Sequence, residues 1–133
     1  MAGLLSLLVL LGLLASCGGG TDDDAEEAEQ VVRDFVSATN ARDADRLCGE
    51  ILTQDYMEKA TGASGEAAGE ACRSELKLLK GLRLRLLRVA DVELDGDQAR
   101  VRAQLLTGRQ QQLRVFEVRR EDGRWRLAGG SEQ

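Results

Sequence analysis

The fold class of this chain can be predicted from the stretch of residues 86–118, LLRVADVELDGDQARVRAQLLTGRQQQLRVFEV. Apolar and polar side chains alternate along it with a period of two, which is typical of strands that bury one face. Two short glycine turns, Asp95-Gly96 and Thr107-Gly108, interrupt the alternation. Because such turns favour hairpins, the stretch predicts three consecutive antiparallel strands.

The same pattern continues on both sides of this stretch. A third turn, Asp122-Gly123, precedes an apolar segment that contains Trp125 and Leu127. We therefore expect an antiparallel meander of about four strands, over residues 83–94, 98–106, 110–120 and 124–128.

Before residue 82 the apolar period is that of a helix. Residues 24–39 repeat apolar side chains every three or four positions, so they predict a first helix. Asp43 is a candidate cap for a shorter second helix, and Ser64 or Gly65 begins a third that Gly81 is placed to end, with a loop over 53–63 between them. Helices followed by a meander predict an α+β fold, with three helices packed on one face of a curved sheet.

The N-terminus has the pattern of an export signal. Residues 1–16 carry no charged side chain, and this apolar run is too short to span a bilayer. The end of this run together with the following cysteine, Leu14-Ala15-Ser16-Cys17, resembles the lipobox of bacterial lipoproteins, in which the cysteine becomes an acylated N-terminus. The resemblance implies an extracytoplasmic protein that acyl chains on Cys17 hold at the cell membrane.

Charge is unevenly distributed along the chain. The chain has 23 acidic and 18 basic residues, but six acids lie between residues 22 and 29, and the sequence from Gln30 onward is nearly balanced. Glycines and like charges favour a solvated, extended tether. We therefore expect a signal peptide over 1–16, a lipidated cysteine and acidic linker over 17–24, one domain over 25–130, and a tail over 131–133.

Two cysteines remain in the expected domain, Cys48 and Cys72. Both fall on the apolar faces of expected helices, and disulfides persist in exported proteins. This pair predicts one disulfide that joins the second helix to the third.

Element order and two phrases give the domain a family resemblance. The domain resembles the NTF2-like superfamily, particularly its small exported lipoproteins and SnoaL-like members. The resemblance is carried by NARDADRLCGEIL, residues 40–52, and VRREDGRWRLAG, residues 118–129. The resemblance implies a cone with an internal pocket, which the superfamily uses for catalysis, ligand binding, dimerisation or partner docking. The fold therefore does not select one function.

Strand register indicates which polar side chains point into such a cone. A two-residue turn at Asp95-Gly96 places Arg88 on the inner face, and one at Thr107-Gly108 adds Gln112 and Arg114. In a regular strand, the apolar residues before and after this point would lie on opposite faces, so we expect a bulge between residues 115 and 116. With Tyr56, these side chains form the candidate ligand-binding set; the alternative is that the arginines lie at the sheet rim with solvated heads.

Composition excludes several kinds of site. The chain has no histidine, which removes the commonest general base and metal ligand, so we expect no metal, no cofactor and no catalytic residue. Arg83, Arg85 and Arg88 form a basic cluster, but four aromatic residues are too few for a nucleic-acid stacking platform.

These observations favour a lipid-anchored protein whose domain binds a small apolar or anionic ligand, a lipid or an envelope protein without catalysis. Two alternatives remain open. One is a structural or homodimerising module that uses the outer sheet face, and the other is a histidine-free NTF2-like lyase or isomerase.

Overall fold

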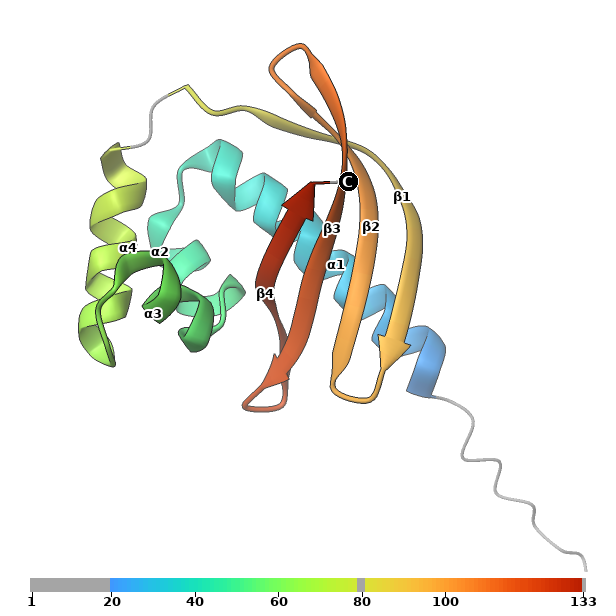
Figure 1. Ribbon diagram of the computed structural model, residues 1–133, viewed down its shortest axis with the longest axis horizontal. Helices are drawn as coiled ribbons and strands as arrows, with labels where there is room; N and C mark the ends of the chain where they lie inside the picture. The colour runs from blue at the N-terminus through green and yellow to red at the C-terminus, as the bar shows by residue number, and fades with distance from the viewer. Residues whose placement is uncertain (1–19, 79–80, 133) are drawn as a thin grey trace, which may run out of the picture.

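The structure, a computed structural model, describes residues 20–78 and 81–132 (Figure 1). Both the expected signal peptide and Cys17 lie outside the described residues. The helical half contains α1 (Gly20–Ala41), α2 (Ala44–Arg46), the π-helical turn η1 (Leu47–Ile51), α3 (Gln54–Thr61) and α4 (Glu66–Leu78). The strands are β1 (Leu84–Asp95), β2 (Gln98–Thr107), β3 (Gln110–Glu121) and β4 (Arg124–Glu132).

The four strands form one antiparallel sheet in the order β1-β2-β3-β4. The sheet is curved, and α1 crosses its inner face, while α4 lies farthest from the strands and packs on the other helices (Figure 1). Helices therefore cover one face of the sheet, and the expected α+β architecture is confirmed.

The core lies between α1 and the inner face of the sheet. Strand alternation points one set of side chains at the helices, and these are almost fully buried. They are Ala99, Val101, Ala103, Leu105, Phe116, Val118, Trp125 and Leu127. Within residues 20–78 and 81–132, the buried apolar residues all lie between Ala28 and Leu127, so the chain from Gly20 onward includes the whole core that the structure describes.

One helix of the structure was not expected from the sequence. Residues 54–61, expected to be a loop, form α3 because Thr53 caps it: the Thr53 hydroxyl oxygen accepts a hydrogen bond from the Tyr56 N–H. Gly62, with a φ of 75°, ends the helix in the left-handed conformation. The described domain thus has four α-helices where the sequence analysis expected three.

Two other boundaries differ from expectation. The first helix already includes Gly20, within the stretch expected to be a linker, and β4 continues to Glu132, within the expected tail. Asp43 caps α2 as expected, since its carboxylate accepts a hydrogen bond from the Arg46 N–H.

Two of the three hairpin turns lie one residue later than expected. Asp95 pairs with Gln98 and Thr107 pairs with Gln110, so the turn residues are Gly96-Asp97 and Gly108-Arg109. The third turn, Asp122-Gly123, is at the expected position.

Asn40 fixes the end of α1 to the start of the sheet. Its amide donates to the Leu84 carbonyl at 2.7 Å and accepts from the Leu84 N–H at 2.8 Å. Since Leu84 is buried, Asn40→Ala leaves two backbone groups without partners, and we expect a loss of about 2 kcal/mol in the free energy of unfolding. Urea denaturation measures this; an unchanged midpoint would show that water replaces both bonds.

Among the described residues, no helix combines the length and the apolar character needed to cross a membrane.

Candidate functional site

A cavity of about 300 Å³ lies among the helices; we call it the helical pocket. It is at the lower end of the range typical of small-molecule sites. Its walls come from four helical elements and from the chain that leads to β1, and most of its lining is apolar. The lining residues are Phe35, Thr39, Leu47, Leu52, Tyr56, Met57, Ala60, Thr61, Cys72, Glu75, Leu76 and Leu82.

The sheet edge positions one wall of the helical pocket. Leu52 forms a parallel bridge with Leu127, and the Thr53 N–H donates to the Leu127 carbonyl at 2.9 Å. The Gln54 N–H adds a hydrogen bond to the Glu121 carboxylate at 3.1 Å. These contacts fix the first turn of α3 against β4, so the Tyr56 and Met57 side chains are held at the cavity.

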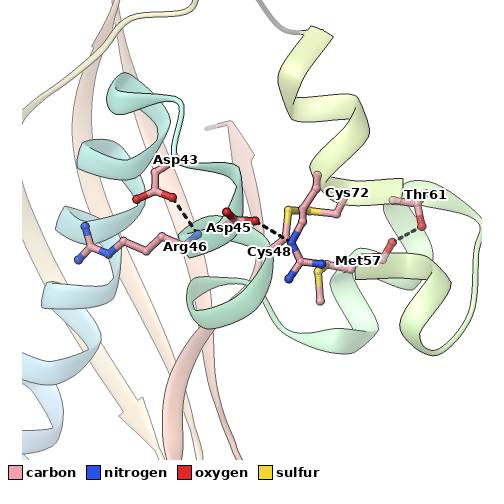
Figure 2. Close-up of a disulfide and its surroundings, with 8 residues drawn as sticks. Asp43, Asp45, Arg46, Cys48, Met57, Thr61 and Cys72 are labelled. Atoms are coloured by element: carbon pink, nitrogen blue, oxygen red, sulfur yellow. Dashed lines mark hydrogen bonds and ion pairs between the residues drawn. A yellow bond between two sulfur atoms is a disulfide. The ribbon is translucent and has the colours of Figure 1, made fainter. Parts of the chain in front are cut away.

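A disulfide holds the opposite wall. Cys48 in η1 is bonded to Cys72 in α4, which confirms the expected pairing (Figure 2). Beside it, the Arg73 guanidinium donates to the Asp45 carboxylate at 3.1 Å. Both links join α4 to the α2–η1 segment, and α4 contributes Cys72, Glu75 and Leu76 to the lining.

The helical pocket offers few polar groups to a ligand. The Thr39 Oγ1 is buried and has no hydrogen-bond partner among the described residues. Tyr56 is half-buried, and of the described residues in the lining Glu75 alone carries a charge. Such a lining suits an apolar molecule with one hydrogen-bonding group better than an anion.

The cavity does not lie where the sequence analysis placed it. Phe35 lies between the helical pocket and the sheet, because its ring packs on Phe116 with the centroids 5.9 Å apart. No strand residue is among the described lining residues. The inner face of the sheet is filled by its own core side chains instead.

The structure contradicts the predicted inward orientation of Arg88. The pairing shifts between Leu86 and Arg88, since Leu86 pairs with Leu105 while Arg88 pairs with Gln104. This bulge at Leu87 turns Arg88 to the outer face, where it is exposed and its Nε donates to the Gln104 side chain at 3.2 Å. Arg88 therefore does not reach the helical pocket.

Gln112 and Arg114 do lie on the inner face, opposite Leu105 and Ala103. Neither lines the helical pocket; the Arg114 guanidinium pairs with Glu132 on β4 at 3.2 Å. The expected bulge between residues 115 and 116 is absent, because the β2–β3 pairing is continuous there. Of the four candidate ligand residues, Tyr56 alone lines the cavity.

A larger groove of about 540 Å³ lies beside the outer face of the sheet, but it is polar. Its Asp55 pairs with Lys59 at 2.9 Å and with Arg119 at 3.7 Å. The hydrogen bond from Lys59 and its charge lower the pKa of Asp55.

Nearby, the hydrogen bond from the Gly65 N–H lowers the pKa of Glu58. A general acid needs the opposite shift, so these carboxylates are unsuited to that role.

No cluster of three or more histidine, cysteine or carboxylate side chains that could hold a metal occurs among the described residues.

Comparison with known proteins supports the fold. The chain is similar to an uncharacterised protein with a cystatin-like fold from Caulobacter vibrioides, with 15% identity, a TM-score of 0.60, and coverage of 84% of this chain and 89% of that one. It is also similar to an NTF2-like protein of unknown function from Silicibacter pomeroyi, with 16% identity, a TM-score of 0.53, and coverage of 85% of this chain and 98% of that one. An NTF2-like protein of unknown function from Pseudomonas putida is similar as well, with 13% identity, a TM-score of 0.52, and coverage of 85% of this chain and 87% of that one. No protein-family model and no curated protein sequence matches the chain. The domain thus has an NTF2-like fold.

Proposed function

We propose that this chain is a non-enzymatic binding protein that holds one small apolar molecule in the helical pocket. The observation that carries the proposal is the cavity itself, because apolar walls with few polar groups are typical of such sites. The proposed location follows from the lipobox-like sequence: acyl chains on Cys17 hold the domain at the outer side of the cell membrane.

Thr39 allows this proposal to be tested without destabilising the fold. Thr39→Phe places a ring in the cavity and removes a hydroxyl that bonds to no described residue. We expect unchanged or higher thermal stability and a loss of at least about tenfold in affinity for the neutral apolar fluorophore N-phenyl-1-naphthylamine. A fluorescence titration on the chain from Gly20 onward measures the affinity.

The matched control is Thr39→Val, which removes the hydroxyl but leaves the cavity open. This variant should bind the fluorophore as the natural sequence does. If Thr39→Phe binds it equally well, the molecule sits elsewhere and the helical pocket is not the site.

The outer sheet face supports a second candidate function, homodimerisation. Leu106, Leu113 and Val115 point away from the helices, because their strand neighbours Leu105 and Phe116 point inward. Such a face could pair with the same face of another copy. Sedimentation equilibrium of Leu113→Arg against the natural chain tests this; a monomer in both cases would rule it out.

A further inference from the structure

One short segment gathers the exposed leucines of the described chain. Leu78 is 78% exposed, Leu82 43% and Leu87 41%, and these are the large apolar side chains that the described residues leave most exposed. All three lie within the ten residues that join the end of α4 to the bulge in β1. Apolar side chains that are exposed on the same surface mark interaction sites, so the segment that carries these three leucines is a candidate for one.

Basic side chains flank these leucines. Lys77, Arg83, Arg85 and Arg88 are all exposed, and none of them forms an ion pair with a described carboxylate. Eight other cations of the described chain do form ion pairs. We call Lys77, Leu78, Leu82, Arg83, Arg85, Leu87 and Arg88 the basic-leucine patch.

The patch lies at one end of an electrically polar molecule. Figure 1 shows the end of α4 and the start of β1 at one end, and the start of α1 with the β1–β2 and β3–β4 turns at the other. The latter end carries exposed acids, namely Asp22, Asp23, Glu26, Glu27, Asp95, Asp97 and Asp122. Glu75 is an exposed carboxylate near the end of α4, but the four cations outnumber it, so this end presents a local attraction to anions although the whole chain has a net charge of −5.

We propose that the basic-leucine patch docks on the surface of an anionic phospholipid bilayer. Lipid phosphates complement the four cations, and the boundary between headgroups and acyl chains accepts leucine side chains. A soluble polyanion would satisfy the cations but would leave the leucines in water. The proposal uses described residues alone and does not depend on acylation of Cys17.

The patch also meets the helical pocket at Leu82, which lines the cavity and is partly exposed. A molecule that enters the pocket beside Leu82 would arrive directly from the bilayer surface. If both proposals hold, lipids or lipid-soluble compounds are the ligand class for the pocket.

The test is partition of the chain from Gly20 onward onto vesicles of phosphatidylcholine mixed with phosphatidylglycerol, compared with vesicles of phosphatidylcholine alone. We expect partition onto the anionic vesicles that weakens between about 0.1 M and about 1 M salt, as the screening length falls from about 10 Å to about 3 Å. Arg83→Gln with Arg85→Gln should lower the partition coefficient about 25-fold, roughly fivefold for each cation.

Two further variants separate the alternatives. Arg100→Gln with Arg124→Gln removes the same charge from exposed cations outside the patch and should leave partition nearly unchanged. Leu78→Gln with Leu87→Gln changes two leucines of the patch that do not line the helical pocket, and it should lower partition about tenfold.

Four results would overturn the proposal. One is absence of binding to anionic vesicles, and another is an equal loss in the Arg100/Arg124 control. The third is a leucine variant that binds vesicles and the soluble polyanion heparin as the natural chain does, which would assign the patch to a polyanion. Self-association through the patch without vesicle binding would likewise assign it to a second copy.

Discussion

Replacing both bridged cysteines, Cys48→Ser with Cys72→Ser, is expected to lower the free energy of unfolding by about 3 kcal/mol. The disulfide closes a loop with a sequence separation of 24, and restricting a loop of this length in the unfolded chain stabilises the fold by that amount. For a domain of this size the thermal midpoint should fall by roughly 10 to 20 °C.

The loss should be concentrated at α4, because this helix has little else to hold it. Ala68 and Cys72 are its buried residues, and α4 packs on other helices rather than on the sheet. Hydrogen exchange in the double variant should therefore accelerate most over residues 66–78, and fluorophore binding in the helical pocket should be lost with it.

The control is the natural chain in reductant, which should reproduce the double variant. Asp45→Asn provides a second comparison, since it weakens only the exposed ion pair to Arg73 and should cost less than about 1 kcal/mol. If reduction leaves the exchange of residues 66–78 unchanged, packing rather than the disulfide holds α4.

Cys17→Ser is expected to convert a membrane-bound protein into one that carbonate washing releases. Two or three acyl chains give stable attachment, because each buried methylene contributes about 0.8 kcal/mol. The serine variant cannot carry these chains, so labelling with a radioactive fatty acid should disappear as well. Fractionation of cells that produce the full chain measures both effects.

Ser16→Ala provides a control that keeps the cysteine and a small residue before it. This variant should remain labelled and membrane-bound. A Cys17→Ser protein that resists the carbonate wash would contradict the anchor, whereas its recovery on membranes only at low salt would be consistent with the basic-leucine patch.

The strands were predictable because their signals are local. Alternation and glycine turns specify each hairpin, and the three turns were located to within one residue. The disulfide was predictable for a similar reason, since both cysteines lie on apolar helix faces and no other pair remains in the domain.

The orientation of Arg88 was not predictable from alternation. Leucines occur at both even and odd positions of β1, with Leu84 and Leu86 inside and Leu87 exposed. The alternation of apolar residues therefore does not indicate the bulge that shifts the pairing. The short helix α3 was missed because Met57 is its single buried residue, although the Thr53 cap and Gly62 could have indicated it.

The helical pocket lies beyond sequence reasoning for a different reason. Its lining comes from separate helices and from Leu82, and the disulfide and the Leu52–Leu127 bridge decide how these elements meet. The residue pattern of one segment therefore cannot predict a cavity that forms between several elements. Tyr56 lines the cavity, as expected from the sequence, whereas the other expected ligand contacts are strand residues that the cavity does not touch.

Native mass spectrometry of the chain from Gly20 onward, purified from a bacterial lysate without detergent, tests the proposed binding function most directly. The proposal predicts one small molecule retained per natural chain, retained also by Thr39→Val and absent from Thr39→Phe. A natural chain with no retained mass, or a Thr39→Phe chain with the same retained mass, would contradict it.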